Sequence, residues 1–283
     1  MALRSPTLNV MVMAAEKAAK GLIRDFGELE QLQVSVKSIG DFVSAADLRA
    51  EKILRRELEK ARPGFSFLLE EGGVIEGSDT EHRWIIDPLD GTTNFLHGIP
   101  HFAISIGLER AGEMVAGIIF NPITNDLFTA EKGGGAFWND RRMRVSGRRK
   151  IDECVVATGI PHKGRGEHPA FLRQLQKVMA STAGVRRMGA AALDLAWTAA
   201  GRYDAYWETH LNAWDVAAGV LMVREAGGYV STLDAKIADP VASGALLASN
   251  EPLHYGLLAL LKDRKPEAAK VEAAKADTSG TEG

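Results

Sequence analysis

Apolar residues recur at helical spacing in two stretches near the start of the chain, residues 7–26 and 45–61, which predicts two helices there. Two short apolar runs follow, at 65–69 and 83–86, and each leads into acidic residues. Further short apolar segments, joined by Gly, Asn-Pro and Asn-Asp turns, predict a largely antiparallel meander of strands. These segments are 102–108, 114–120, 127–130, 136–138 and 143–145.

Beyond Asp152 the pattern changes to alternating helices and strands, which indicates an α/β arrangement. The predicted strands are 155–158, 203–207, 229–232 and 246–248, and the predicted helices are 169–179, 190–200, 214–226 and 253–261. We therefore predict an α/β fold with an α+β portion over residues 1–150 and an α/β portion over 151–262. Residues 263–283 contain scarcely an aliphatic anchor, so we expect a disordered tail there.

Composition is that of an ordinary globular protein, with 46% hydrophobic and 25% charged residues among 283. A net charge of -3 gives no general electrostatic reason to bind nucleic acid, although residues 141–150 form a local basic run. The single cysteine, Cys154, excludes an internal disulfide and favours a cytoplasmic location. No stretch approaches the roughly 20 apolar residues of a membrane span.

Acidic residues stand at the ends of predicted elements in a pattern that favours metal chemistry. Asp87 and Asp90 follow an apolar strand, Glu70 follows another, and Asp215 begins a predicted helix. Mg²⁺ prefers such oxygen ligands, and two cations about 3.5 to 4 Å apart can activate a water for attack on phosphate. The turn at 91–93 can open a helix whose N–H groups would hold that phosphate. Taken singly, Asp90 and Asp215 could equally be helix N-caps or turn residues.

Three segments together resemble the signature motifs of the inositol monophosphatase family, the magnesium-dependent, lithium-sensitive sugar phosphatases. They read FLLEE at 67–71, WIIDPLDGTTNF at 84–95 and WDVAAG at 214–219. Weaker similarity covers 37–47 and the substrate-side stretch 187–194. The resemblance extends over about residues 7–262, and it implies the layered αβαβα sandwich of that superfamily.

The resemblance also implies a set of metal ligands. The first Mg²⁺ would bind Glu70, Asp87 and the backbone carbonyl of Leu89, and the second would bind Asp87, Asp90 and Asp215. A more labile third ion would depend mainly on Glu70 and water. Asp87 would therefore bridge the two main cations.

The same resemblance assigns roles in catalysis and phosphate binding. Thr92, with Asp47 behind it, would orient and help deprotonate the attacking water, which Glu70 would contact through the metal. The N–H groups of Gly91 and Thr92 would hold the phosphate, as the turn chemistry also indicates. Glu70, Thr92 and Asp47 are thus the predicted catalytic residues.

On the substrate side, the resemblance implies that Asp90, Gly189, Ala191 and Glu208 meet the hydroxyls of a sugar or inositol. On composition alone Glu208 is equally a surface acid at a strand end. The family pattern is broken at Ala190, where many relatives have Ser or Thr. It is also broken at 159–166, whose basic side chains could recognise a second anionic group.

The leading prediction is an enzyme that hydrolyses myo-inositol 1-phosphate with metal-activated water, working as a cytoplasmic homodimer. Fructose 1,6-bisphosphate, histidinol phosphate and 3'-phosphoadenosine 5'-phosphate are the alternative substrates. A non-enzymatic alternative is an accessory protein of RNA processing or of RNA polymerase, because bacterial relatives associate with such machinery. The basic run at 141–150 could serve that role.

Overall fold

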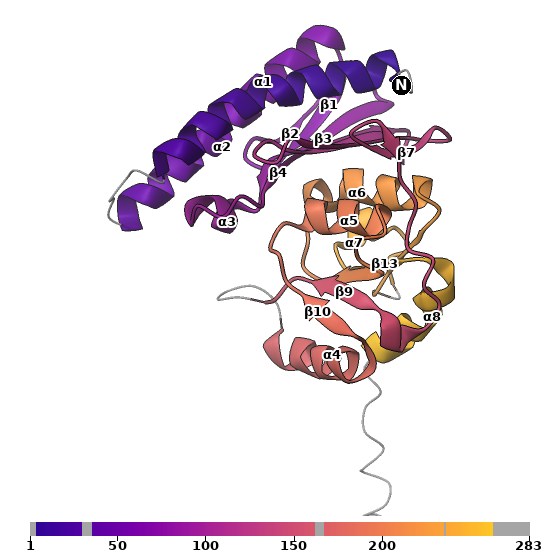
Figure 1. The fold of residues 1–283 in the computed structure, drawn as a ribbon. Coiled ribbons are helices and arrows are strands. Elements are labelled where there is room, and N and C mark those ends of the chain that lie inside the picture. The colour runs from indigo at the N-terminus through magenta and orange to yellow at the C-terminus, as the bar shows by residue number, and fades with distance from the viewer. Residues whose placement is uncertain (1–3, 30–35, 162–166, 235, 263–283) are drawn as a thin grey trace, which may run out of the picture.

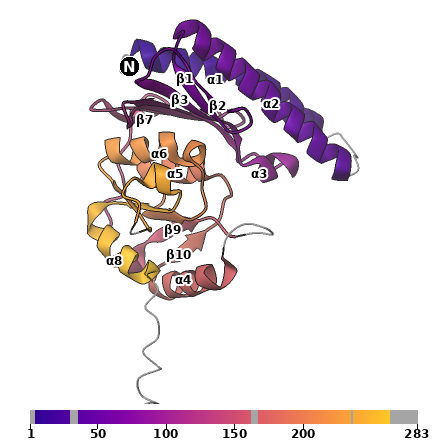
Figure 2. The same cartoon turned by 180° about the vertical axis from the view of Figure 1, so that it is seen from behind.

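The computed structural model describes residues 4–29, 36–161, 167–234 and 236–262, with the backbone alone over 36–44. Five layers, αβαβα, are stacked in it (Figure 1; Figure 2). The helices are α1 (Pro6–Leu29), α2 (Val36–Ala61), α3 (Thr92–Leu96), α4 (His168–Ser181), α5 (Ala191–Ala199), α6 (Ala213–Glu225), α7 (Pro240–Ser243) and α8 (Glu251–Leu261), with a 3₁₀ turn at Ile151–Glu153.

The larger sheet has eight strands in the order β2-β1-β3-β4-β5-β6-β7-β8. All neighbouring pairs are antiparallel except β1 and β3, which run parallel. The strands are β1 (Ser66–Leu69), β2 (Gly73–Ile75), β3 (His82–Asp90), β4 (Ala103–Arg110), β5 (Glu113–Asn121), β6 (Asp126–Glu131), β7 (Gly135–Trp138) and β8 (Arg141–Arg142). The parallel pair matters for function, because it places the ends of β1 and β3 at the same edge.

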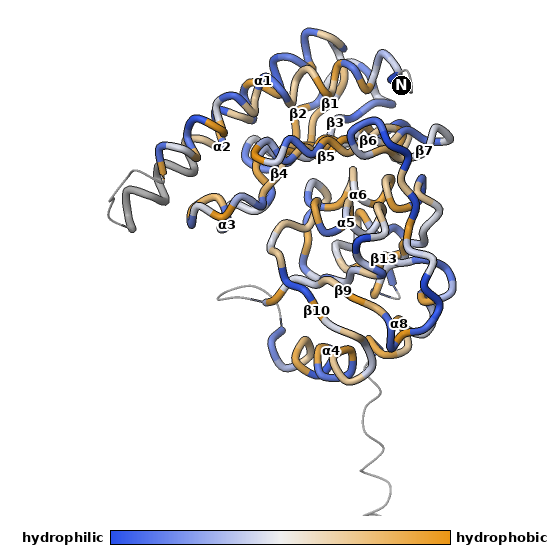
Figure 3. Tube along the Cα trace, in the orientation of Figure 1, coloured by the Kyte–Doolittle hydropathy of each residue, from blue (hydrophilic) through white to orange (hydrophobic). Residues whose placement is uncertain are grey.

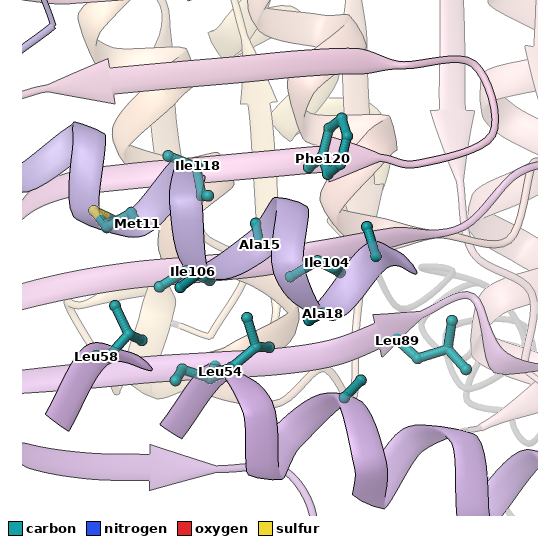
Figure 4. Packing of buried hydrophobic residues seen from close by; sticks show 14 of the residues in the cluster. Met11, Ala15, Ala18, Leu54, Leu58, Leu89, Ile104, Ile106, Ile118 and Phe120 are labelled. Carbon is teal, nitrogen blue, oxygen red and sulfur yellow. The ribbon is translucent and has the colours of Figure 1, made fainter. Parts of the chain in front are cut away.

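Helices α1 and α2 cover the outer face of this sheet, where small and aliphatic residues at helical spacing pack on the strands. Figure 4 shows this contact, with helix residues facing the aliphatic side chains of the strands. The labelled residues are Met11, Ala15 and Ala18 of α1, Leu54 and Leu58 of α2, and Leu89, Ile104, Ile106, Ile118 and Phe120 of the strands. All ten are buried, so this face is a continuous apolar core.

The smaller sheet has the order β10-β9-β11-β13-β12. Its strands are β9 (Val155–Thr158), β10 (Gly184–Arg186), β11 (Ala205–Glu208), β12 (Tyr229–Thr232) and β13 (Leu246–Ser249). Helices α4 and α8 cover its outer face, and α5 and α6 fill the layer between the two sheets. Hydrophobic residues follow these central elements in Figure 3, and both α5 and α6 are buried along most of their length.

The structure confirms the predicted α/β class and the layered sandwich, and it corrects one boundary and one strand. The second helix begins at Val36 instead of residue 45. The predicted strand at 143–145 is wrong, because its backbone bonds do not form a ladder with one strand: the Met143 N–H donates to the Ala136 carbonyl of β7 (2.8 Å), and the Val145 N–H donates to the Ala226 carbonyl just after α6 (3.2 Å). The boundary at residue 150 stays a prediction, since α6 contacts both sheets.

Some predictions fall on parts of the chain that lie outside the described residues. They are the tail at 263–283, the unmatched loop at 162–166, and the side chains of the family-like segment up to residue 44. None of the helices in the described ranges is long and apolar enough to cross a membrane. Cys154 is fully buried and unpaired, as its apolar neighbours indicate.

Candidate active site

A pocket of about 230 Å³ opens between the two sheets. It forms where the ends of β1, β3, β9 and β11 meet the first turns of α3, α5 and α6. The sequence-predicted residues that line it are Glu70, Asp87, Leu89, Asp90, Gly91, Thr92, Gly189, Ala191, Glu208 and Asp215. Segments more than a hundred residues apart in sequence thus contribute to one cavity.

The end of β3 brings Asp87 and Asp90 into the pocket. This strand is held between β1 and β4, and its pairing with β4 is interrupted between the two acids. Pro88, which has no N–H to donate, stands at this irregularity, a position that suits proline. The Leu89 N–H turns back to the Asp87 carboxylate (2.9 Å). Both acids are nearly buried, with exposed fractions of 2% and 9%.

Glu70 reaches the same place from the neighbouring strand. It directly follows β1, and its N–H donates to the Ile86 carbonyl (3.2 Å), which extends the parallel register by one residue. A side-chain hydrogen bond joins Glu70 to Asp87. The other carboxylate oxygen of Glu70, Oε2, is buried and has no hydrogen-bond partner among the described residues.

Burial and mutual repulsion raise the pKa values of these carboxyls. Desolvation is the main cause for Glu70, whose pKa rises to about 7, with further repulsion from Asp215. Desolvation likewise raises the pKa of Asp87 and Asp90 well above the ordinary range, and the neighbouring acids add to it. The described residues around these carboxyls therefore do not compensate their ionised forms, and the raised pKa values favour the protonated forms.

Asp47, on α2, belongs to the same electrostatic cluster but does not line the pocket. Burial, reinforced first by Glu70 and then by Glu71 and Glu51, raises its pKa to about 8. Its Oδ1 is buried without a hydrogen-bond partner in the described part of the chain. The Thr92 hydroxyl donates to the Leu89 carbonyl (3.1 Å), so the pairing of Thr92 with Asp47 stays a prediction.

The turn after β3 has the geometry expected of a phosphate-binding backbone. Gly91 adopts a left-handed conformation (φ 92°) and caps α3, which begins at Thr92. A Cβ at Gly91 would lie 3.0 Å from the His101 carbonyl oxygen and 3.2 Å from the Ala190 Cβ. Glycine is therefore required both by conformation and by space. The predicted helix start after Asp90 is confirmed.

Asp90 also links the two halves of the site. Its carboxylate accepts the backbone N–H groups of Ala191 (3.3 Å) and Ala192 (2.8 Å) at the start of α5. The Asn94 amide donates to the carbonyls of His101 (2.7 Å) and Met188 (2.9 Å), which fixes the irregular segment leading into α5. These long-range bonds explain how α3 and α5 come to face one pocket.

Asp215 enters from the first turn of α6. The helix begins at Ala213 with Asn212 as its N-cap, so the N-cap reading of Asp215 is wrong. Asp215 instead accepts the Asn212 N–H (2.7 Å), and the same carboxylate lines the pocket. The capping box places an acid, Asp215, three residues after the N-cap. The same position brings Asp215 close enough to Asp90 to raise the pKa of Asp90 further.

The acids fit a divalent cation in charge and ligand type. Five carboxylates and one arginine of the described residues line the pocket, and the unpaired oxygen of Glu70 has the burial that a cation would compensate. Among the described residues no three His, Cys, Asp or Glu side chains are already arranged around one metal position.

Sequence reasoning missed several residues of the pocket. Phe171, Gln174 and Trp207 line it beside the predicted substrate contacts. They come from α4 and β11, and no sequence spacing signals that these elements converge. Arg187, the first residue of the substrate-side stretch 187–194, lines the pocket too. His210 also lines the pocket, and its positive φ of 65° marks a backbone conformation that is uncommon outside glycine.

Comparison with known proteins agrees with the geometry. The model of the inositol monophosphatase family matches residues 3–265. An inositol-1-monophosphatase of Mesorhizobium japonicum is 58% identical over 94% of this chain and 99% of its own length. A Nus factor SuhB of Pseudomonas aeruginosa is 40% identical over 94% of this chain and 99% of its own.

A solved structure shows the same fold. The extragenic suppressor protein SuhB from Bartonella henselae superposes with a TM-score of 0.84 and is 55% identical, over 92% of this chain and 99% of the other. The family match spans nearly all of the described residues and includes every pocket segment. This chain belongs to the inositol monophosphatase family.

Proposed function

We propose that the pocket hydrolyses a phosphomonoester of a polyol, with myo-inositol 1-phosphate as the leading substrate. One observation carries the proposal: buried carboxylates with uncompensated charge meet a glycine turn beside a helix start in one pocket. A carboxylate cluster alone would repel a phosphate, so the arrangement requires cations to bind one. The names of relatives at 56–58% identity support the same substrate.

We propose Mg²⁺ as the metal, in two sites and with a labile third. Glu70, Asp87 and the Leu89 carbonyl would hold the first, and Asp87, Asp90 and Asp215 the second. When bound, the ions would lower the pKa of a water and neutralise the charge that develops on phosphate. The resemblance to lithium-sensitive relatives predicts inhibition by millimolar Li⁺, and a flat Li⁺ titration would contradict it.

The chain's own residues would orient the water and the phosphate. The Thr92 hydroxyl, now bonded to Leu89, stands where it could accept a hydrogen bond from the water instead. Asp47 would accept the proton as a general base. In the metal-free protein, burial and then the Glu70 charge raise the pKa of Asp47. The N–H groups of Gly91 and Thr92 would hold the phosphate oxygens through the attack.

The substrate's hydroxyls would lie toward the smaller sheet. Glu208 would accept from them there, and Asp90, Gly189 and Ala191 complete that side. The neighbouring Trp207, Phe171 and Ile160 offer apolar surface to the ring face. A polyol, with donors around its edge and an apolar face, matches this lining.

A substrate panel tests the proposal. Phosphate release is measured with Mg²⁺ from the phosphates of myo-inositol and histidinol, fructose 1,6-bisphosphate and 3'-phosphoadenosine 5'-phosphate. We expect the highest kcat/KM with inositol 1-phosphate and no activity after chelation. A higher kcat/KM with a bisphosphate would favour that bisphosphate as the substrate. Hydrolysis without Mg²⁺ would contradict the proposed metal-dependent reaction.

A second candidate comes from relatives named Nus factor SuhB at 38–45% identity. In this chain Arg141, Arg142 and Arg149 of the basic run are exposed. Salt-sensitive binding to RNA or RNA polymerase that survives Asp87→Asn would support a role of that kind. If Asp87→Asn removed every measurable phenotype, the result would favour the enzymatic function over an accessory role. A homodimer and a cytoplasmic location, both typical of the family, complete the proposal.

A further inference from the structure

The Glu208 carboxylate contacts Tyr206, on the same strand, and Gly159, which follows the neighbouring strand β9. Glu208 ends β11, and the hydroxyl of Tyr206, two residues earlier, donates to Glu208 Oε2 at 2.6 Å. Residues two apart on a strand point to the same face, which explains why these two side chains meet. Tyr206 is fully buried in the core between the sheets, so its hydroxyl is a fixed donor.

Gly159 makes the room for that carboxylate. β9 and β11 are parallel, with Trp207 opposite Thr158, so the register places Gly159 opposite Glu208. A Cβ built on Gly159 would lie only 2.0 Å from the Glu208 carboxyl carbon and 2.0 Å from Oε1. The backbone of Gly159 is not in the left-handed region, so glycine is favoured here by space alone, because a Cβ would displace the end of the Glu208 side chain.

Glu208 needs such a restraint because other acids surround it. Asp90 and Asp194 both interact electrostatically with Glu208, and Asp194 is 1% exposed with an unpartnered Oδ1 in the described part of the chain. Repulsion from both would favour rotamers in which the Glu208 carboxylate leaves the pocket. Burial, the first cause, and the Glu208 charge keep the pKa of Tyr206 well above its usual value, so it remains a donor.

We propose that Tyr206 and Gly159 are positioning residues that fix the Glu208 carboxylate for recognition of a substrate hydroxyl, and thereby set the preference for polyol phosphates. The inference rests on the proposed function. Neither residue lies among the predicted metal ligands, and Tyr206 does not line the pocket. Their effect should therefore fall on substrate binding and leave the chemical step intact.

Two variants perturb the carboxylate from opposite sides. Tyr206→Phe removes the hydroxyl and keeps the ring, and Gly159→Ala introduces the Cβ that the carboxylate must avoid. We expect each to raise KM for inositol 1-phosphate about tenfold, the order expected when a hydrogen bond to a charged group is lost, with kcat within about twofold of wild type. KM for p-nitrophenyl phosphate, which has no hydroxyls to recognise, should not change.

Tyr203→Phe is the matched control. Tyr203 is 5% exposed in the same core, and the structure gives it no hydrogen bond to Glu208. This variant should keep wild-type KM for both substrates. An equal rise in KM for both substrates, or a fall in kcat, with Tyr206→Phe would mean a general structural role and would overturn the proposal.

Crystal structures of the two variants supply a readout that needs no activity. We expect the Glu208 carboxylate to change rotamer in both, while the acids around Asp87 keep their positions. An unmoved Glu208 would overturn the positioning role, whatever the enzyme hydrolyses. If wild type hydrolyses p-nitrophenyl phosphate but not inositol phosphate, the proposed substrate fails, and the rotamers still decide whether Tyr206 and Gly159 position Glu208.

Discussion

Buried aspartates occur in two different settings in this protein. Asp25, on α1, is 2% exposed and is bonded by Arg24 (2.8 Å) and Arg49 (2.6 Å). Asp87 is equally buried, yet its neighbours are Glu70, Asp90 and Asp215, which all raise its pKa together with burial. The same side chain is thus neutralised by arginines in one region and surrounded by other acids in the other, where we propose that a cation binds.

This contrast separates structural acids from functional ones. Asp204, another buried acid, follows the structural pattern, with Arg148 at 3.1 Å and the Val155 N–H at 2.7 Å. Burying a charge without a partner is costly, so the acids of the pocket destabilise the metal-free fold. Such a cluster is expected where the missing charge is supplied by ligand and metal.

The largest effect is expected for Asp87→Asn. We expect kcat to fall by about a thousandfold or more, because the proposed bridging ligand is lost. The melting temperature of the metal-free variant should rise, since one source of repulsion is removed. Steady-state kinetics and thermal melts in a chelator measure both. Full activity in this variant would refute the metal assignment.

Asp25→Asn should have the opposite pair of effects. Loss of the charge-assisted hydrogen bonds should lower the free energy of unfolding by about 1–3 kcal/mol. The lower end is favoured, because the side chains of Arg24 and Arg49 are 62% and 46% exposed. Denaturant unfolding measures the change. The turnover of Asp25→Asn should match that of wild type. An increase in its free energy of unfolding would contradict the proposed difference between the arginine-paired Asp25 and the clustered acids of the pocket.

A smaller, pH-dependent effect is expected for Asp47→Asn. The pKa of Asp47 is about 8 in the folded protein against a reference of 3.8, so folding favours the protonated form. Its contribution to stability is full below about pH 4 and is lost as pH rises toward 8. The metal-free variant should therefore gain a few degrees over wild type at about pH 9 and little at about pH 4. A difference in melting temperature between Asp47→Asn and wild type that does not depend on pH would contradict the raised pKa of Asp47.

Lys132→Ala gives the baseline for exposed pairs. Lys132 and Glu113 form an ion pair with side chains 53% and 68% exposed. Removing it should change the free energy of unfolding by less than about 0.5 kcal/mol. If denaturant unfolding showed a larger loss of free energy, an exposed ion pair would stabilise the fold as much as the bonds of Asp25 to Arg24 and Arg49.

The sequence allowed prediction of how the Asp87 motif is placed better than prediction of the contacts that hold Glu208. Asp87, Asp90 and Gly91 are neighbours in one motif, and the end of a single strand places them together. Glu208 depends instead on Tyr206 and on Gly159, which directly follows β9. The register of β9 against β11 sets that contact, and a linear pattern does not specify it.

The predicted helices and strands were mostly confirmed, because apolar spacing reports burial directly. The wrong predictions fall at segments whose backbone groups hydrogen-bond to residues outside the neighbouring strand or helix that the sequence pattern suggests. Met143 and Val145 are apolar and alternate as in a strand, yet the Val145 N–H donates to the carbonyl of Ala226, just after α6. Asp215 has the composition of a cap, but Asn212 performs that role.

Calorimetric titration of Mg²⁺ into the metal-free protein at pH 7, with Asp87→Asn and Asp25→Asn alongside, tests the contrast most directly. We expect wild type and Asp25→Asn to bind Mg²⁺ and to release about one proton or more, because cations displace protons from carboxyls whose pKa is raised. Asp87→Asn should bind far more weakly. Equal binding by all three proteins, or no binding by wild type, would show that the pocket acids do not form a cation site.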